Sequence, residues 1–185
     1  VLRMADIVLI AKSHSAASAD LAEVRDNVRR IQPSARIVQG ASPVLLDDAP
    51  AVQGRRVLVV EDGPSITHGG MAFGAGYVAA TEAHAAEIID PRAAAVEEIA
   101  AVYAQYPHIG RVLPAVGYHP AQLAALARTI SRADADLVVS GTPCDLAALI
   151  EIDKPIVRAR YEYAELEKPG LGESIDAFLA ERGLG

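Results

Sequence analysis

The hydrophobic and polar positions of this chain form two kinds of segment that follow one another regularly. Short apolar runs without polar alternation, such as Ile7–Ile10 and Val57–Val60, predict strands that are buried on both faces. Stretches in which apolar residues recur every three or four positions, such as 21–31, predict amphipathic helices. This alternation predicts an α/β fold with a mostly parallel sheet and helices on both faces.

The same patterns predict the approximate bounds of each element. Strands are expected at residues 7–10, 36–39, 57–60, 87–89, 111–113, 137–139 and 155–160. Three helices are expected from their start signals: one after a capping box at Asp20 and Glu23, one after Asp90-Pro91, and one after Thr142–Asp145. The helix after Asp90-Pro91 should bury Val96, Ile99 and Tyr103. Further helices are expected at 78–85, near 123–130 and near 175–179. The polar connection 41–54 contains prolines, so we expect a boundary there between domains 1–54 and 55–185.

Composition narrows the class of protein. A chain of 185 residues can bury one full core. Its formal net charge of −7 argues against nucleic acid or an anionic membrane as a partner. A single cysteine excludes an internal disulfide and fits the cytoplasm. The longest apolar run is too short to cross a bilayer. There is no initiator methionine, so we expect the C-terminal portion of a longer polypeptide, with a homo-oligomer left open.

Polar and glycine residues gather where the predicted strands end. If all strands run parallel, these residues meet at one edge of the sheet, where α/β proteins bind ligands. The residues at strand ends are Lys12, Glu61, Asp62, Asp90, Arg92, Tyr118, His119, Gly141, Thr142 and Asp145. The sequence therefore predicts a cleft at that edge.

The richest of these strand ends is the glycine-rich stretch 63–76. Its backbone amides can cradle phosphate oxygens, with Gly69 and Gly70 as candidates. The alternative is a tight turn in which Gly74 and Gly76 only allow close helix–sheet contact. The stretch lacks the G-K-[ST] of a Walker A loop and the G-x-G-x-x-G spacing of a dinucleotide site, which disfavours an NAD-dependent oxidoreductase.

Three polar residues in and before this stretch are candidate catalytic groups. Glu61 and Asp62 point to opposite faces of an extended segment, so one of them can serve as a Mg²⁺ ligand or general base. Asp62 is our candidate, and Glu61 has pairing with an arginine as its alternative role. Thr67 and His68 are expected to contact substrate, the alternative for His68 being an ordered loop residue without chemistry.

Two later segments offer anion-binding groups, each with a structural alternative. Thr142 begins a Thr-x-x-Asp helix-capping pattern with Asp145, whose following amides are open to an anion. Arg158 and Arg160 share one strand face and either grip phosphate or face solvent. The remaining histidines lack metal-ligand spacing and Cys144 has no zinc partners, so we predict no transition-metal site.

Several blocks together resemble a known family. In chain order they are EDGPSITHGGMAFGAGYVAA, IIDPRA, YPHIGRVLPAVGY, DLVVSGTPCDL and KPIVRARYE. The chain from about residue 5 to 163 is similar to the C-terminal region of the cyclic 2,3-diphosphoglycerate synthetase family, also described as predicted GTPases. The resemblance implies a P-loop nucleotide-binding domain joined to α/β domains. It also implies an ATP- and Mg²⁺-dependent ligase that closes a pyrophosphate within a phosphorylated small acid.

The resemblance extends to the first domain, which would be the tail end of a P-loop NTPase domain. ADIVLIAKSHSA resembles the strand and base-recognition loop usually written [NT]-K-x-D. Lys12 would stack on the nucleotide base and Ser42 would lie near it. His14 replaces the acid that binds guanine, which favours ATP over GTP. No P-loop lies within the chain, so we expect it to be inactive without an upstream P-loop domain of the same polypeptide.

These observations combine into one expected reaction and one rival. In the first, Asp62, Thr67, His68 and Arg92 act on a phosphorylated small molecule. The residues expected to bind its phosphates are Gly69, Gly70, Gly74, Gly76, Thr142, Arg158 and Arg160. The Thr67–Gly70 segment would supply amide and imidazole donors to the transferred group. The rival is a non-catalytic module of a predicted GTPase that binds a small anion or packs against a partner.

Overall fold

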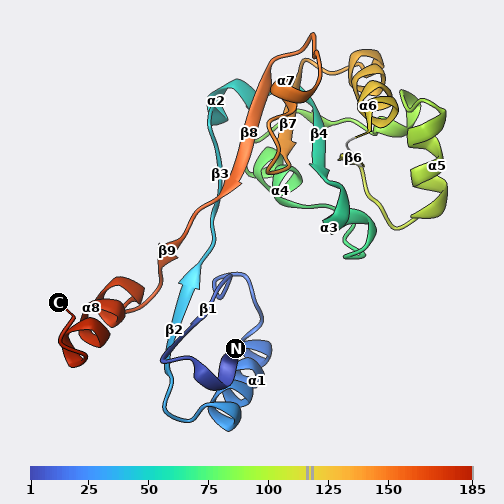
Figure 1. Cartoon of the computed structure of the whole chain (residues 1–185). Coiled ribbons are helices and arrows are strands. Elements are labelled where there is room, and N and C mark those ends of the chain that lie inside the picture. Colours follow the sequence, from blue (N-terminus) through green and yellow to red (C-terminus); the bar gives the residue numbers. More distant parts are fainter. Residues whose placement is uncertain (116, 118, 185) are drawn as a thin grey trace. The chain divides into compact units, whose positions relative to one another are not determined.

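The computed structural model describes residues 1–115, 117 and 119–184 (Figure 1). Its contacts divide the chain into two compact units. Unit 1 consists of Val1–Pro43 together with Tyr161–Gly185, and unit 2 consists of Val44–Arg160. The chain therefore begins in unit 1, forms the whole of unit 2, and returns to unit 1.

Unit 2 is built on a sheet whose central strand is β4 (Arg56–Asp62). The strand order is β3 (Val44–Leu46), β8 (Ile156–Tyr161), β7 (Leu137–Gly141), β4 and β5 (Glu87–Ile88). Two strands pair with different parts of β4. β5 pairs with the first two residues of β4, and β6 (Leu113–Ala115) pairs with its last three. β4 is parallel to β5, β6 and β7, and β7 is parallel to β8, which confirms a parallel centre for this sheet.

The core of unit 2 surrounds β4. Val57, Leu58, Val59 and Val60 are all 0% exposed. Successive side chains of a strand point to opposite faces, so both faces of β4 are covered. This agrees with the uninterrupted apolar run, which is typical of a strand in a doubly covered parallel sheet.

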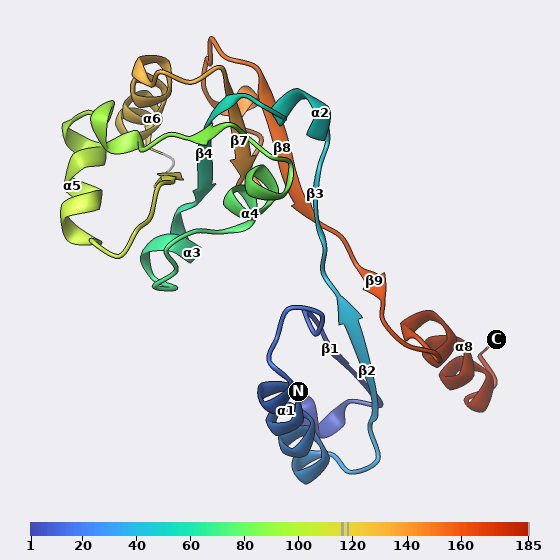
Figure 2. The same cartoon turned by 180° about the vertical axis from the view of Figure 1, so that it is seen from behind.

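Helices of unit 2 pack on the sheet and on one another. They are α2 (Ala49–Val52), α3 (Gly63–Thr67), α4 (Ala75–Glu82), the 3-10 turn η2 (Pro91–Ala93), α5 (Glu97–Gln105), α6 (Pro120–Arg132) and α7 (Leu146–Leu149). α4 packs on β4 and β7, and α3 packs on β4 and β6. α5 and α6 lie side by side (Figure 2). Val96, Ile99 and Tyr103 are buried there, as the helical spacing predicts.

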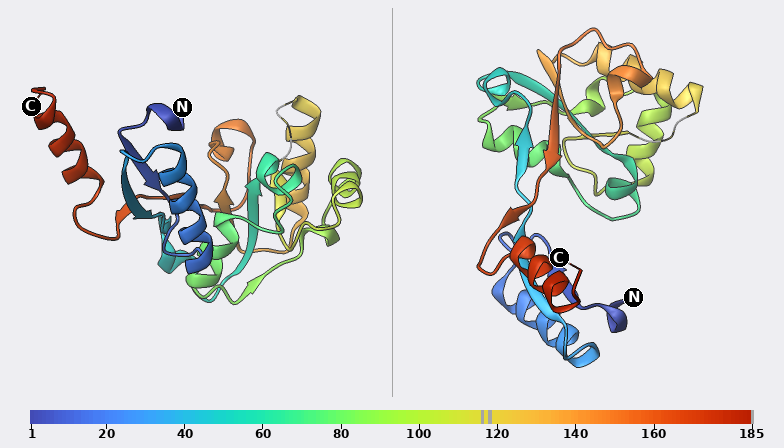
Figure 3. Two further views of the ribbon diagram at one scale, coloured as in Figure 1. Left: turned by 90° about the horizontal axis from the view of Figure 1, so that it is seen from below. Right: turned by 60° about the vertical axis from the view of Figure 1, so that its left-hand side comes forward.

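Unit 1 contains a βαβ arrangement. β1 (Ile7–Ile10) is parallel to β2 (Arg36–Ala41), and α1 (Ser18–Ile31) connects them. β9 (Ala164–Glu165) adds to β2 in the antiparallel direction. α8 (Leu171–Glu181) contacts β2 and β1, and the short turn η1 (Leu2–Met4) precedes β1 (Figure 3). The chain is therefore mixed α/β, and its described strand pairings include the antiparallel pair of β2 and β9 beside the parallel ones.

The structure differs from the predicted elements in several places. The connection 41–54, expected to be irregular, contains β3 and α2, and the division between units falls at residues 43 and 160, not at 54. Asp47 explains part of this difference, because its backbone amide donates to the carbonyl of Arg158 (3.0 Å) and so fixes β3 beside β8. The predicted capping box of α1 is wrong, since that helix begins at Ser18 with Ala17 before it.

Among the described residues, none of the helices combines the length and apolar character that crossing a bilayer requires.

The buried strand β4 sets the first testable prediction. Leu58→Ala should lower the free energy of unfolding by about 3 kcal/mol, because it removes a fully buried side chain and leaves a cavity. Leu45→Ala is the matched control, since Leu45 is 39% exposed in the edge strand β3 and should cost less than about 1 kcal/mol. Urea denaturation measures both. Equal losses would contradict β4 as the centre of the core.

Candidate functional site

The carboxyl ends of three strands of unit 2 meet at one edge of its sheet. Glu61 lies opposite Pro114 of β6 and Gly141 of β7, and Asp62 lies opposite Ala115. The segments that follow β4, β6 and β7 therefore leave the sheet at the same level, as a parallel arrangement requires. Tyr118 of the predicted cluster lies outside the described residues.

Glu61 has a structural role that the sequence does not reveal. Its carboxylate is 1% exposed and accepts hydrogen bonds from the backbone amides of Gly74 (3.1 Å) and Tyr77 (2.8 Å), at the start of α4. Burial raises the pKa of Glu61, while the amides of Tyr77, Gly76 and Gly74 lower it and the charge of Asp62 raises it again. The expected alternative, an arginine partner, is wrong: the described partners of Glu61 are amides at a helix N-terminus.

Two glycines make room for this carboxylate. A Cβ atom on Gly74 would lie 2.6 Å from Oε2 of Glu61, and one on Gly141 would collide with the same oxygen. Gly141 ends β7 and Gly74 precedes α4, so the carboxylate is enclosed by a neighbouring strand and a helix start. A Cβ on Gly76 would likewise lie 3.0 Å from Cγ1 of Val59, so both Gly74 and Gly76 allow close helix–sheet contact, while phosphate binding by these glycines stays a prediction.

Asp62 lies at the end of β4 and caps α3. Its Oδ2 accepts from the backbone amide of Ser65 (3.3 Å) and from the Ser65 hydroxyl (2.8 Å). The sequence predicts a loop here, but Asp62 as N-cap and Pro64 in the first turn start a short helix. Both described bonds of Asp62 use Oδ2, and the residue is half-buried, so Oδ1 can receive a cation or a proton.

Thr67 and His68 end α3 as a bonded pair. Thr67 is buried, and its Oγ1 donates to the carbonyl of Gly63 (2.8 Å). The same Oγ1 lies 2.9 Å from Nδ1 of His68, whose side chain is exposed. The His68 ring stands 6.3 Å from the ring of Tyr106, and Tyr106 meets His108 edge-on at 6.1 Å. His108 in turn lies 2.8 Å from the carbonyl of Ile66, which ties the end of α3 to the segment after α5.

Gly69 and Gly70 follow His68 in an exposed turn. The amide of Gly69 donates to the carbonyl of Pro64 (3.2 Å), and a side chain at this position would collide with the backbone of Ser65. Gly70 has φ of +66°, which favours glycine. The turn places both residues at solvent next to His68, where the sequence predicts phosphate contact.

Arg92 makes several contacts with backbone carbonyls, and its predicted catalytic role stays a prediction. It follows β5, and β5 pairs only with Arg56 and Val57 at the start of β4. Its guanidinium donates to the carbonyls of Ile109 (2.5 Å) and Gly110 (2.9 Å), and to Asp90 (3.2 Å). It also lies over the ring of Tyr103, 4.4 Å from the centroid. These contacts hold the segment before β6, and none of the described contacts joins Arg92 or Asp90 to Asp62.

Thr142 follows β7 at the shared edge. It is 3% exposed, and its Oγ1 accepts from the amide of Cys144 (3.3 Å). The N-cap of α7 is Asp145, whose side chain accepts a hydrogen bond from the amide of Ala148 (3.3 Å). The prediction that Thr142 begins the capping pattern of this helix is therefore wrong. Thr142 stabilises the turn that leads to the helix.

Arg158 and Arg160 share the exposed face of β8 but have different partners. Arg158 lies opposite Ser140 of β7 and donates to the carbonyl of Pro143 (3.1 Å), which places it beside the Thr142 turn. Arg160 forms an ion pair with Asp47 just after β3. Of these two arginines, Arg158 is the one whose described contacts place it at the edge that carries Thr142.

Lys12 and Ser42 lie in unit 1, in a sheet separate from that of Asp62. Lys12 follows β1 with φ of +58°, and its ammonium lies 4.3 Å from the centroid of the Tyr161 ring. Ser42 follows β2, and its amide donates to Nδ1 of His14 (3.3 Å). The loops after these two parallel strands are thus bonded to each other, while their role in nucleotide binding stays a prediction.

The predicted edge therefore forms from fewer residues than expected. Asp62, the Thr67–Gly70 turn, Thr142 and Arg158 follow or flank the strands of unit 2 that meet there. Tyr106 and His108 were missed, because nothing in the helical pattern around residue 103 shows that the chain turns back toward α3. Within the described part of the chain, no three His, Cys, Asp or Glu side chains gather closely enough to hold a metal ion.

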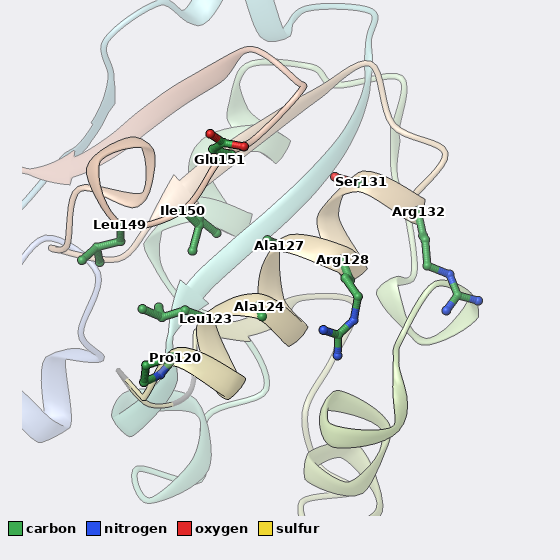
Figure 4. A pocket seen from close by; sticks show the side chains of 10 residues that line it. All are labelled: Pro120, Leu123, Ala124, Ala127, Arg128, Ser131, Arg132, Leu149, Ile150 and Glu151. Carbon is green, nitrogen blue, oxygen red and sulfur yellow. The ribbon is translucent and has the colours of Figure 1, made fainter.

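A separate groove lies between α6 and the segment around α7 (Figure 4). It has a volume of about 790 Å³, and Leu123, Ala127, Leu149 and Ile150 form much of its apolar lining. The predicted site residues are not among the described residues that line it.

Comparison with known proteins identifies one informative relative. No model of a known protein family matches this sequence. The chain is 47% identical over 174 residues to arginine synthetase ArcE of Thermococcus kodakarensis. The matched region is 94% of this chain and 39% of that protein. The similarity indicates that the chain is related to this synthetase, of whose length it spans well under one half.

The buried carboxylate of Glu61 gives a prediction with a defined sign. Because the pKa of Glu61 is raised in the folded protein, the carboxyl contributes most to stability when the pH is below 4.5, the ordinary pKa of a glutamate. This contribution is lost as the pH rises through the pKa of the folded state. Glu61→Gln keeps an oxygen for the two amides and cannot ionise. Urea denaturation across pH should therefore show the variant gaining stability relative to the natural protein as pH rises.

Two further variants complete this test. Glu61→Ala leaves the amides of Gly74 and Tyr77 without their acceptor and should cost about 1–3 kcal/mol. Glu151→Gln removes an exposed carboxyl of the same unit and serves as the control for the charge change alone. A Glu61→Gln variant that loses stability as pH rises would show that burial is not the dominant influence on this group.

Proposed function

We propose that this chain is part of a ligase-type synthetase that uses ATP to activate a small substrate, and that the substrate binds at the carboxyl edge of β4, β6 and β7. The observation that carries the proposal is the 47% identity to arginine synthetase ArcE along 94% of the chain. Similarity of that extent includes every segment that forms the edge. Parallel α/β sheets bind their ligands at this edge.

The substrate we propose first is one from which arginine, or a similar product, is formed. A synthetase that makes arginine joins a nitrogen to a carbon, which requires the carbon's oxygen to be activated as a leaving group. Citrulline is the simplest candidate, because it is arginine with one guanidine nitrogen replaced by oxygen. Activation by ATP would convert that oxygen into a phosphate ester.

The contacts of the arginines also favour a substrate with few negative charges. Closing a pyrophosphate brings several phosphates together and needs cations to neutralise them. Of the three predicted arginines, Arg92 donates to the backbone carbonyls of Ile109 and Gly110, and Arg160 pairs with Asp47. Arg158 is the one placed beside the Thr142 turn, and a single guanidinium suits a carboxylate or one phosphate.

The cofactors of the proposal are ATP and Mg²⁺. Asp62 is the carboxylate at this edge whose described bonds leave one oxygen for a cation. Mg²⁺ is often held by one or two carboxylates together with substrate phosphates, so this donor suits it. Mg²⁺ would neutralise the phosphate of the activated substrate. In unit 1, Lys12 and Ser42 are the candidates for the nucleotide base, with ATP preferred over GTP because His14 replaces the acid that binds guanine.

A second candidate is cyclic 2,3-diphosphoglycerate synthetase activity. The sequence blocks around His68, Asp90, Tyr106 and Thr142 favour it, since they resemble that family. In this reaction one substrate phosphate is activated by ATP and attacked by the other. The Thr67–Gly70 turn and Arg158 would then bind phosphate.

Product analysis distinguishes these candidates. The natural full-length protein is incubated with ATP and Mg²⁺, and either with citrulline and ammonium or with 2,3-diphosphoglycerate. Arginine is measured by amino-acid analysis, and a cyclic pyrophosphate by phosphorus NMR. We expect arginine together with released phosphate. Formation of neither product would refute a synthetase with these substrates.

Asp62 provides the corresponding variant. Asp62→Asn retains an oxygen that caps α3 but loses the charge, and it should lower kcat roughly 100-fold. Asp134→Asn is the control, because Asp134 pairs with Arg56 at the opposite end of β4 and should leave turnover unchanged. Equal activity of both variants would exclude Asp62 from the reaction.

A further inference from the structure

The hydroxyl of Thr67 determines which nitrogen of His68 carries a proton. Oγ1 of Thr67 lies 2.8 Å from the carbonyl oxygen of Gly63 and 2.9 Å from Nδ1 of His68. A threonine hydroxyl has one hydrogen. If that hydrogen pointed to Nδ1, two oxygen acceptors would face each other at 2.8 Å without a proton between them. The hydroxyl therefore donates to Gly63, and Nδ1–H of His68 donates to the hydroxyl.

The other ring nitrogen of neutral His68 then has an open lone pair. Nε2 is an acceptor in this tautomer, and the side chain is exposed at the end of α3. The sequence predicts that the imidazole of His68 donates a hydrogen bond to the transferred group. In this neutral tautomer Nε2 carries no hydrogen, so it can only accept one. A base whose orientation is fixed by a second residue is the usual arrangement of a general base.

We propose that Thr67 holds His68 in the Nδ1–H tautomer so that Nε2 takes the proton from a nitrogen nucleophile as it attacks the activated substrate. This inference rests on the proposed function and names the kind of nucleophile that the site serves. The nitrogen forms a bond to the substrate carbon, and the carbon–oxygen bond to the ATP-derived phosphate breaks. Phosphate leaves with the electron pair, and the proton of the nitrogen moves to Nε2.

The two candidate reactions differ in their need for this base. An attacking amine or ammonia must lose a proton to give a stable product. An attacking phosphate is already an anion and has no proton to lose. An oriented, neutral imidazole acceptor is therefore useful to the first reaction and of little use to the second, for which a protonated imidazole would be the helpful form.

The described contacts of α3 and His68 show which ionisable groups lie around Thr67 and His68. Asp62 caps α3 at its opposite end, and Tyr106 and His108 come from the segment after α5. β4 and β6 pack against α3, and of their ionisable groups Glu61 is turned to the amides of α4. Among the described contacts, the one that fixes a ring nitrogen of His68 is the bond to Thr67.

Nitrogen NMR of histidine-labelled protein tests the tautomer without any substrate. The His68 signals are assigned by their loss in His68→Gln. At a pH where the ring is neutral, Nε2 should show the shift of an unprotonated nitrogen and Nδ1 that of a protonated one. Thr67→Val removes the acceptor and should raise the Nε2–H population, whereas Thr67→Ser keeps the hydroxyl and should preserve the natural pattern. A protonated Nε2 in the natural protein would overturn the inference.

Turnover tests the role as base. With citrulline, ammonium and ATP, His68→Gln should lower kcat at least about 100-fold. Added imidazole should restore part of the activity to His68→Gly, which a purely structural histidine would not allow. Thr67→Val should lower kcat with little change in KM, and Thr67→Ser should not.

The outcomes separate this inference from the proposed function. If the His68→Gln variant retains turnover, His68 is not the base, while the proposed synthetase function still holds. Absence of turnover in the natural protein overturns the synthetase and the base together, and the NMR signals still decide whether Thr67 sets the tautomer. Cyclic pyrophosphate formation unaffected by His68→Gln would assign the site to an anionic nucleophile instead.

Discussion

One buried carboxylate determines how the central elements of unit 2 fit together. Glu61 is at the end of β4, accepts hydrogen bonds from the amides that begin α4, and lies against Gly141 of β7. A buried carboxylate without a cation is costly unless backbone donors satisfy it. Here a helix N-terminus supplies the donors and a favourable dipole. The strand, the helix and the neighbouring strand must therefore keep this spacing for the charge to be tolerated.

That constraint also determines which groups remain for chemistry. Because Glu61 turns into the protein, its neighbour Asp62 is at the opposite side of the strand and starts α3. α3 then places Thr67 and His68 one helix length from the strand end, with Thr67 buried and His68 at solvent. The candidate site thus consists of residues whose orientation is fixed by backbone bonds made nearby. Pre-organisation of this kind lowers the cost of aligning a base with its substrate.

Much of the fold follows from the sequence, because the relevant signals are local. The apolar run 57–60 is a doubly buried strand, and Val96, Ile99 and Tyr103 form the buried face of α5. The errors arise where the deciding contact is distant in sequence. β3 needs Arg158 as a backbone partner, and β9 returns to pair with β2, so a linear division at residue 54 could not anticipate units that combine both ends of the chain.

The candidate site was predicted in the same uneven way. The sequence points to the glycine-rich stretch and Asp62 because a strand end beside glycines is a local pattern. The roles of Glu61, Arg92 and Thr142 depend on their hydrogen-bond partners, and those partners are not visible in the sequence. Arg92 is the clearest case, since charge and position after a strand suggest phosphate binding while its contacts are the carbonyls of Ile109 and Gly110.

The character of the remaining groups bears on the chemistry of the proposed synthetase. Of the three arginines considered for phosphate, Arg158 is the one that a described contact places beside the Thr142 turn at the shared edge. The same edge carries Asp62, which has one oxygen outside its described bonds, and α3 follows it with the imidazole of His68 at its end. Such a set accepts protons and a cation better than it neutralises several phosphates. It is therefore better matched to the proposed joining of a nitrogen to an activated carbon than to the alternative reaction, in which two phosphates are brought together.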